Sequence, residues 1–320
     1  MAKPVVFFIV GPTASGKTDA AVEAALKLDG EVISADAIQI YRGLDKGSAK
    51  PTIEEMRGIK HHMIDIVDHT CEDYNVARFA SDAMHCIEDV VSRGKAPIVA
   101  GGTGLYVNAL LYPLNFTEVK PDNELRQRLM KEENAEPGIL HDRLKEVDPK
   151  SAARLHPNDV KRIVRALEVY ELTGKTLTEH GGDFLNDKNE QIPFLPVIAG
   201  ICMERSKLYD RIDRRVDVML ENGLVEEAEK LYFGSDRKPL LSLQAIGYKQ
   251  FSAYFAGEAT LEETVALIKR ETRRFAKRQI AWFKRDKRIR WFDRDEYDTQ
   301  KELNSAITEY FTEERERLEQ

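Results

Sequence analysis

The amino-acid sequence predicts an α/β fold with a parallel sheet as its core, an inserted all-helical domain and a helical C-terminal region. Three observations lead to this prediction. Strand and helix patterns alternate over the first hundred residues, as they do in βαβ units. A glycine-rich motif separates the first strand pattern from the first helix pattern. Strand-like runs disappear between about residues 115 and 190 and return at about residue 195.

The elements of the core follow one another in a regular order. Val5–Val10 is a continuous apolar run, which is typical of a central parallel strand buried on both faces. Apolar residues at helical spacing predict a helix over Lys17–Leu28, with Gly30 as its expected C-cap. The further expected elements of this part are strands at 31–36, 63–67 and 97–102 and a helix at about 76–93.

A helical segment interrupts this core. Charged amphipathic patterns replace strand patterns from about residue 115, and the last of them begins at Asn158 or Asp159 and ends at Gly174. A polar linker is expected at 181–191, then a strand at 195–203, and every pattern beyond 205 is helical. The expected domains are an α/β core with C-terminal helices, 1–114 and 191–320, and a helical insertion, 115–190.

Composition narrows the class of protein. Of the 320 residues, 42% are hydrophobic, which is enough for a core and too much for a disordered chain. No apolar run approaches the roughly 18 residues that a membrane-spanning helix needs, so no membrane association is expected. Three widely separated cysteines indicate neither a disulfide framework nor a zinc site. We therefore expect a reduced, soluble, cytoplasmic protein, and a monomer.

The motif GPTASGKT at residues 11–18 matches a phosphate loop and lies between a strand and a helix, as such loops require. Its backbone N–H groups would surround an anion at a helix N-terminus, whose dipole favours negative charge. Lys17 is expected to contact phosphate oxygens and the Thr18 hydroxyl to ligate Mg²⁺. The motif predicts a diphosphate or triphosphate and leaves the reaction open. The expected contacts are Gly11, Pro12, Thr13, Ala14, Ser15, Gly16, Lys17 and Thr18, with Arg211 and Arg215, which would otherwise pair with neighbouring aspartates.

Two other strand ends are expected near this loop, because ligands of open α/β sheets bind beyond the carboxyl ends of the strands. Asp36 follows the second strand and would act as a general base or hold a metal, or else would cap a turn. Thr103, in the motif GGTGLY, has a hydroxyl that can hydrogen-bond a ligand, although the motif also suits a tight βα turn. Asp65 and Asp68 are weaker candidates for a Walker-B-like acidic residue.

The net charge of −7 is unevenly distributed along the chain. Residues 269–290 contain 11 lysines and arginines and two acids, so this stretch carries +9 and the other 298 residues carry −16. Like charges spaced i,i+4 destabilise a helix, so a polyanionic partner explains the cluster better than a solvated face does. The expected open face comprises Arg270, Arg273, Arg274, Lys277 and Arg278, with Ile268, Phe275 and Phe283 facing a core. Further basic patches are expected at Lys161, Arg162 and Arg165, and at Arg126 and Arg128.

From about residue 5 to 290 the chain resembles the bacterial tRNA dimethylallyltransferases, because blocks typical of that family occur in the same order. They are GPTASGKT, SADAIQIYRGLDKGSAKPT, HHMIDI, GGTGLY, HPNDVKRIVRALEV, RIDRRVDVMLENGLVEE, QAIGYK and AKRQIAWFKR. The resemblance implies a P-loop NTPase-like core with a tRNA-binding insertion. It also implies transfer of a dimethylallyl group from dimethylallyl diphosphate to N6 of the adenosine 3′ of the anticodon. The implied partner is the anticodon stem-loop of tRNA, and the implied cofactor is Mg²⁺.

The resemblance also implies roles for individual residues. Residues 13–18 match those that bind the prenyl diphosphate, Asp36 matches the general base, and Thr103 and Arg126 match positions near the target nucleotide. The chain departs from the family pattern at Ala37, Ser48, Ala281 and Lys284, where Ser, Thr, Thr and Arg are common. The implied tRNA contacts are Asp36, Ala37, Ile38, Gln39, Thr103, Arg126, Lys161, Arg162, Ile163, Val164, Arg165, Gln244, Gly247, Lys249, Lys277, Arg278, Gln279, Trp282 and Lys284.

Two other functions explain parts of the sequence. A P-loop kinase of a nucleoside or small metabolite would use the phosphate loop and Asp36 but leaves the basic stretch without a role. An RNA adaptor that binds a nucleotide without chemistry leaves the position of Asp36 beside the loop unexplained. Prenyl transfer to tRNA accounts for all three features and is the expected activity.

Overall fold

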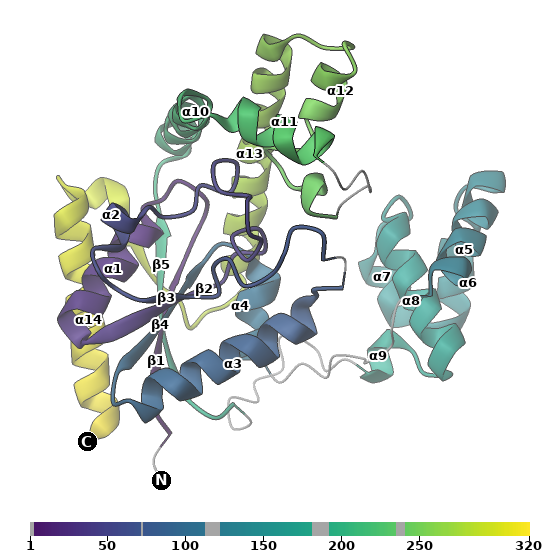
Figure 1. Ribbon diagram of the computed structural model, residues 1–320. Coiled ribbons are helices and arrows are strands. Elements are labelled where there is room, and N and C mark those ends of the chain that lie inside the picture. Colours follow the sequence, from purple (N-terminus) through teal and green to yellow (C-terminus); the bar gives the residue numbers. More distant parts are fainter. Residues whose placement is uncertain (1–2, 72, 113–121, 181–191, 235–240) are drawn as a thin grey trace. The chain divides into compact units, whose positions relative to one another are not determined.

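The computed structural model describes residues 3–71, 73–112, 122–180, 192–234 and 241–320. The chain divides into two compact units (Figure 1). Unit 1 comprises Met1–Leu111 and Ile192–Gln320, and unit 2 comprises Tyr112–Gln191. The polar linker expected at 181–191 lies outside the described residues.

A six-stranded sheet forms the centre of unit 1. Its strands are β1 (Val5–Val10), β2 (Gly30–Ser34), β3 (His61–His62), β4 (Ala96–Gly101), β5 (Leu195–Cys202) and β6 (Arg290–Asp293). They pair in parallel in the order β3-β2-β4-β1-β5-β6. β1 lies between β4 and β5 and is buried along almost its whole length, which is why its sequence is apolar at every position.

Helices cover both faces of the sheet (Figure 1): α1 (Lys17–Leu28) and α14 (Gln300–Glu319) on one face, and α3 (Val76–Ser92) and α4 (Gly104–Leu111) on the other. On the first face, the rings of Phe7 and Phe311 lie 4.8 Å apart and join β1 to the C-terminal helix. On the second face, the rings of Phe79 and Tyr106 stack at 3.9 Å. The predicted α/β fold with a parallel sheet is confirmed.

The remaining elements of unit 1 are mostly helical: α2 (Ile53–Met56), α10 (Arg205–Glu221), α11 (Leu224–Phe233), η2 (Leu241–Gln244), α12 (Phe251–Phe255), α13 (Leu261–Phe283) and η3 (Arg294–Glu296). α13 packs against α10, α12 and α4, and so connects the helical region to the helix that follows β4. No helix in the described part of the chain is long and apolar enough to cross a membrane.

Unit 2 consists of helices α5 (Asn123–Ala135), α6 (Ile139–Val147), α7 (Pro149–Arg154), α8 (Val160–Thr173) and α9 (Leu177–His180). Its core contains leucines from α5, α6 and α8, including Leu129, Leu140 and Leu167, all 0% exposed. α8 ends at Gly174 as expected, and Asp159 stands at its N-cap position without a side-chain capping hydrogen bond.

Three predicted elements are wrong in detail. The strand expected at 63–67 does not form: β3 is limited to His61–His62, because Met63 and Asp65 have positive φ values of 62° and 55°, which no strand allows. Asp29, rather than Gly30, is the C-cap of α1, with φ 49°. The chain beyond 205 is not wholly helical, because Arg290–Asp293 adds strand β6 beside β5.

A buried ionic cluster fixes the end of the sheet formed by β2 and the edge strand β3. The carboxylate of Glu31, a residue only 5% exposed, accepts two hydrogen bonds from the Arg93 guanidinium at 2.5 and 2.7 Å. His62 on the neighbouring strand lies 2.7 Å from the same carboxylate. These hydrogen bonds, chiefly those from Arg93, lower the pKa of Glu31 to about 2.

We predict that Glu31→Gln lowers the free energy of unfolding by about 3 kcal/mol at pH 7. The folded-state pKa of Glu31 is lowered from 4.5 to about 2, so the carboxylate stabilises the fold above pH 4.5 and progressively less as pH falls toward 2. Urea unfolding of both proteins at pH 7 and pH 3.5 measures the difference. A difference that stays the same at both pH values would contradict the assignment.

Candidate active site

The phosphate loop connects β1 to α1 through three residues with positive φ. Gly11 has φ 148°, and a Cβ there would lie 2.6 Å from the carbonyl oxygen of Ile201, so β5 requires glycine at this position. Gly16 is the N-cap of α1 with φ 94°, and Ala14 has φ 62°. The loop therefore has the tight turn that exposes backbone N–H groups to an anion at the N-terminus of α1.

Lys17 lies within this turn, and its ammonium group donates to the carbonyl oxygen of Pro12 at 2.5 Å. The pKa of Lys17 is lowered to about 7, mainly by burial and then by Arg215, while Asp36 acts in the opposite direction. The Ser15 hydroxyl is buried and has no hydrogen-bond partner among the described residues. An anion bound in the loop would supply a partner for Ser15 and favour the charged form of Lys17.

A cleft of about 1090 Å³ opens beside the loop, between α10, α2 and the segment that precedes α2. Arg211 of α10 donates from Nε to the carbonyl oxygen of Ala14 at 2.8 Å, and Arg215 donates to that of Ala49 at 3.3 Å. Burial lowers the pKa of both guanidinium groups, and neither pairs with an aspartate in the described part of the chain. The structure therefore favours the interpretation that Arg211 and Arg215 contact phosphates over the alternative that they pair with neighbouring aspartates.

Asp36 and Thr103 meet where β2 and β4 end. The Thr103 hydroxyl oxygen accepts a hydrogen bond from the Ala37 N–H at 3.1 Å. Oδ1 of Asp36 accepts hydrogen bonds from the N–H groups of Ile38 and Gln39 at 2.8 and 3.3 Å. Asp36 thus caps a turn with one oxygen, while Oδ2 makes no hydrogen bond to a described residue. The turn-capping interpretation of Asp36 is confirmed, and its role as a general base stays a prediction that the turn does not exclude.

Backbone contacts place Asp36 near the phosphate loop. The Thr103 N–H donates to the Ala35 carbonyl oxygen at 3.3 Å, and a Cβ on Gly102 would lie 3.3 Å from the Gly11 carbonyl oxygen. The charge of Asp36 partly opposes the lowering of the pKa of Lys17 and of Arg215 by burial. The ends of β1, β2 and β4 therefore converge, as expected from the parallel sheet.

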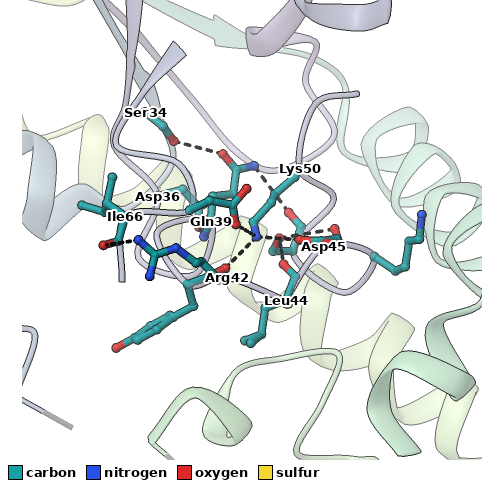
Figure 2. A network of polar contacts seen from close by, with 12 residues as sticks. Ser34, Asp36, Gln39, Arg42, Leu44, Asp45, Lys50 and Ile66 are labelled. Atoms are coloured by element: carbon teal, nitrogen blue, oxygen red, sulfur yellow. Dashed lines mark hydrogen bonds and ion pairs between the residues drawn. The ribbon is translucent and has the colours of Figure 1, made fainter. Parts of the chain in front are cut away.

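The segment that follows Asp36 is held by the polar network in Figure 2. The side chain of Lys50 is 7% exposed and pairs with Asp45 at 2.6 Å and Asp65 at 2.5 Å. Asp65 therefore neutralises Lys50, which argues against a Walker-B-like role for this residue. Gln39, an expected tRNA contact, accepts a hydrogen bond from the Ser34 hydroxyl at 3.0 Å. Lys50 lies within a family block, but the sequence did not predict its ion pairs, because Asp45 and Asp65 come from separate turns.

α13 contacts the site through buried side chains. Gln279, expected to contact tRNA, is instead 5% exposed and bonds to both loops: its Oε1 accepts from the Thr13 N–H and its Nε2 donates to the Gly102 carbonyl oxygen, each at 2.9 Å. Trp282 packs on Gly104, where a Cβ would lie 2.3 Å from the indole ring. The close approach of α13 thus requires Gly102 and Gly104, whereas Gly101 is required by Ala35, whose carbonyl oxygen would lie 2.3 Å from a Cβ there.

The basic stretch is only partly an open face. Lys277, Arg278 and Lys284 are exposed, as expected for a surface that binds a polyanion. The prediction that Arg273 belongs to the open face is wrong, because this residue is half-buried and pairs with Asp213 of α10 at 2.6 Å. The helix ends at Phe283, so the last part of the stretch at 269–290 leads into β6. Ile268 and Phe283 are buried as expected, whereas Phe275 is only partly buried.

The predicted site residues of unit 2 are divided between surface and core. Glu168 is 0% exposed and binds Arg126 through two hydrogen bonds, at 2.8 and 2.9 Å, and Arg165 at 2.6 Å. Lys161 and Arg162 are exposed on α8. The side chains of Ile163 and Val164 are buried in the core of the unit. Arg128 is exposed and pairs with Glu171.

Three expected tRNA contacts, Gln244, Gly247 and Lys249, lie where two segments of backbone approach each other closely. Gln244 and Lys249 are exposed, and Gly247 between them is buried with φ 99°. A Cβ on Gly247 would lie 3.3 Å from the carbonyl oxygen of Gly47. This glycine therefore has a packing role, and its exposed neighbours remain predicted contacts.

Sequence reasoning missed the contribution of α14. Gln300 lies beside Gly16, where a Cβ would be 2.7 Å from its amide oxygen. Its amide nitrogen donates to Asn304, which in turn donates to Asp19 of α1 at 2.8 Å. Polar residues scattered along a C-terminal helix give no signal that they face a loop almost 300 positions earlier.

Comparisons with known proteins agree with this architecture. The family model described as IPP transferase matches residues 39–286. A tRNA dimethylallyltransferase of Acetivibrio thermocellus is 47% identical, with 95% of this chain and 96% of the relative covered. One from Halalkalibacterium halodurans is 46% identical, with 92% and 93% covered.

Solved structures show the same similarity. The full-length tRNA isopentenylpyrophosphate transferase from Bacillus halodurans has a TM-score of 0.73 at 42% identity, covering 99% of this chain and 98% of that one. A eukaryotic dimethylallyltransferase captured acting on tRNA has a TM-score of 0.77 at 32% identity, covering 98% and 80%. The family match, the near-complete coverage and the geometry of the site agree: this chain belongs to the IPP transferase family.

Proposed function

We propose that this chain transfers a dimethylallyl group from dimethylallyl diphosphate to N6 of the adenosine 3′ of the anticodon of tRNA. The observation that carries the proposal is the position of Asp36 at the end of β2, next to Ala37, whose N–H binds the Thr103 hydroxyl in the turn that borders the phosphate loop. Membership of the IPP transferase family and similarity to tRNA dimethylallyltransferases support the substrate class. A carboxylate next to a polyphosphate site suits alkyl transfer to a weak nucleophile, and the exposed Lys277 and Arg278, which a small-molecule kinase leaves without a role, favour tRNA as the acceptor.

The phosphate loop would serve the leaving group. An exocyclic adenine amine is a weak nucleophile, because its lone pair is delocalised into the ring. The reaction therefore depends on stabilising the charge that collects on the diphosphate as its bond to the allylic carbon breaks. Backbone N–H groups of the loop, the Ser15 hydroxyl and Lys17 would contact that diphosphate, and Arg211, bonded to the Ala14 carbonyl oxygen, would lie beside them.

The residues at the start of α1 also fit a magnesium ion. The Thr18 hydroxyl lies in the lining of the cleft next to Lys17, as the hydroxyl ligand of a phosphate-loop magnesium site does. Among the described residues there is no cluster of three or more His, Cys, Asp or Glu side chains, so the remaining ligands would be diphosphate oxygens and water. When bound, the ion would offset negative charge on the diphosphate.

Asp36 would act on the nucleophile. As N6 forms its bond to the allylic carbon, the C–O bond to the diphosphate breaks and its electron pair leaves with the diphosphate. The amine must lose one proton, and Oδ2 of Asp36 is available to take it because Oδ1 is held by Ile38 and Gln39. Thr103, fixed by the Ala37 N–H, would orient the base that enters the site.

The target adenosine would leave its stack to reach Asp36, which costs a few kcal/mol and less in a loop than in a duplex. Contacts to the RNA backbone would offset that cost. Lys277, Arg278 and Lys284 of unit 1 and Lys161 of unit 2 are exposed, so their charges are available to phosphates. Arg162 is also exposed but pairs with Asp159 at 3.2 Å, so a phosphate would compete with that carboxylate. We propose the anticodon stem-loop as the part of tRNA that they bind.

The first prediction from the proposed function tests the reaction itself. Protein, Mg²⁺ and undermodified tRNA are incubated with labelled dimethylallyl diphosphate or with labelled ATP. Label from the prenyl donor is expected in tRNA, at the adenosine 3′ of the anticodon after nuclease digestion. Phosphate transfer from ATP without prenyl incorporation would establish the kinase alternative.

The second prediction separates the two roles of Asp36. Asp36→Asn keeps an oxygen for the Ile38 and Gln39 N–H groups but cannot accept a proton, so turnover should fall by about 10²–10⁴-fold. Affinity for tRNA and the melting temperature should stay close to those of the wild type. Single-turnover prenylation and a binding assay measure both. If Asp36→Asn is active and only Asp36→Ala is inactive, the residue serves the turn alone.

The third prediction concerns the basic face of α13. Replacing Lys277 and Arg278 with Ala should weaken tRNA binding and reduce the slope of log K against log salt by up to about two units. The matched control is Arg315→Ala with Arg317→Ala, which removes the same charge from α14. An equal change of slope in both double variants would show that only net charge matters.

A further inference from the structure

The carboxylate of Glu227 binds a run of backbone N–H groups that lies far from it in the sequence. Glu227 is in the first turn of α11, and its Oε2 accepts hydrogen bonds from the N–H groups of Asp45 and Lys46, each at 3.0 Å. Its Oε1 accepts from the N–H groups of Lys46 and Gly47 at 2.9 and 3.2 Å. Successive N–H groups of this kind form a concavity that binds an anion, and here the protein supplies the anion itself.

Tyr248 completes this contact. The residue is 0% exposed, and its hydroxyl donates to Oε1 of Glu227 at 2.6 Å while it accepts from the Gly47 N–H at 3.1 Å. A Cβ on Gly47 would lie 2.5 Å from the tyrosine ring, so the backbone packs directly on that ring. Both oxygens of Glu227 are acceptors, which a glutamine amide cannot reproduce because its nitrogen is a donor.

The segment held in this way ends at Ala49, whose backbone needs such support. Ala49 has φ 47°, in the left-handed region that an alanine adopts only when its surroundings impose it. Its N–H donates to the Lys46 carbonyl oxygen at 3.0 Å, and the next residue, Lys50, pairs with Asp45 at 2.6 Å (Figure 2). The residues that Glu227 holds therefore fix the direction of the Ala49 carbonyl group.

This carbonyl oxygen accepts a hydrogen bond from Arg215 at 3.3 Å. It is the one hydrogen-bond partner of Arg215 among the described residues, and no acid among them forms an ion pair with this guanidinium. Arg215 lines the same cleft as the phosphate loop. A long side chain with many rotamers needs a fixed partner if its guanidinium is to point toward a ligand before that ligand binds.

We propose that Glu227 is a positioning residue for the leaving group: it holds the segment that ends at Ala49, and the Ala49 carbonyl oxygen orients Arg215 toward the diphosphate. This inference rests on the proposed function. Glu227 is not among the residues that line the cleft, so its effect on the diphosphate would pass through Arg215. A charged donor that is oriented in advance lowers the cost of ordering it on binding.

The test is a double-mutant cycle that measures the affinity of the full-length protein for inorganic diphosphate in Mg²⁺ by titration calorimetry. Arg215→Ala should weaken binding by about tenfold or more, because a hydrogen bond between charged groups is lost. Glu227→Gln should weaken it by about fivefold in the wild-type background and by less than about twofold in the Arg215→Ala background. The disappearance of the effect identifies the residue through which Glu227 acts.

Two further variants make the test specific. Glu226→Gln removes the same charge from the same turn of α11, and its carboxylate makes no hydrogen bond to the described residues, so diphosphate affinity should stay within about twofold of the wild type. Tyr248→Phe keeps the ring but removes the hydroxyl that joins Glu227 to Gly47. It should weaken diphosphate binding and lose this effect beside Arg215→Ala, which keeps the test decisive if Glu227→Gln does not fold.

The inference is overturned if Glu227→Gln weakens diphosphate binding equally in both backgrounds, because the carboxylate would then serve folding alone, as a lowered melting temperature would show. It is also overturned if Arg215→Ala leaves the affinity unchanged, or if Glu226→Gln has the same effect as Glu227→Gln. Gln39 offers a second route, since its Nε2 lies 3.4 Å from the Ala49 carbonyl oxygen. An effect of Glu227→Gln that disappears beside Gln39→Ala and persists beside Arg215→Ala would reject the assignment to Arg215.

Prenyl incorporation by the same wild-type preparation separates this inference from the proposed function. Incorporation into tRNA without coupling between Glu227 and Arg215 rejects this inference alone. If the wild type binds diphosphate but incorporates no prenyl group, the proposed function is rejected.

Discussion

The phosphate loop must stay in one conformation before any phosphate binds it, and much of unit 1 is arranged to meet that constraint. Segments distant in sequence each hold part of the loop: β5 against Gly11, α10 at Ala14, α13 at Thr13 and α14 beside Gly16. A loop fixed in this way keeps its N–H groups aimed at the ligand, so little reorganisation is needed when negative charge develops. Burial of Lys17 is the cost of that arrangement, and its lowered pKa is the result.

The net charge of this protein does not show where its basic residues lie, because some arginines are paired with acids and other basic residues are exposed. Some arginines pair with buried or half-buried acids on a neighbouring helix and so hold the two helices together. Examples are Arg273 with Asp213 and Arg126 with Glu168. The basic residues left exposed, such as Lys277 and Arg278, are those available to an RNA backbone. A net charge of −7 therefore coexists with a surface suited to tRNA.

Patterns in the sequence predicted the sheet well where strands are buried on both sides and poorly at its edges. β1 was predicted with the right bounds, because a central parallel strand requires an unbroken apolar run. The strand expected at 63–67 failed, because this segment turns instead toward Lys50, which pairs with Asp65. β6 was missed because an edge strand pairs on one side only, and its four residues lie among charged neighbours.

The sequence by itself determined the parallel α/β core, the phosphate loop and the convergence of Asp36 and Thr103 on it, because a parallel sheet places the carboxyl ends of its strands at one edge. It also carried the family blocks that indicate prenyl transfer. Only the tertiary structure decided which polar residues are exposed and which hold the site: Gln279, expected as a tRNA contact, is buried and bonds to Thr13 and Gly102. The reason is physical, because a side chain's partners depend on which distant backbone groups the fold brings within hydrogen-bond distance, and local spacing does not encode that.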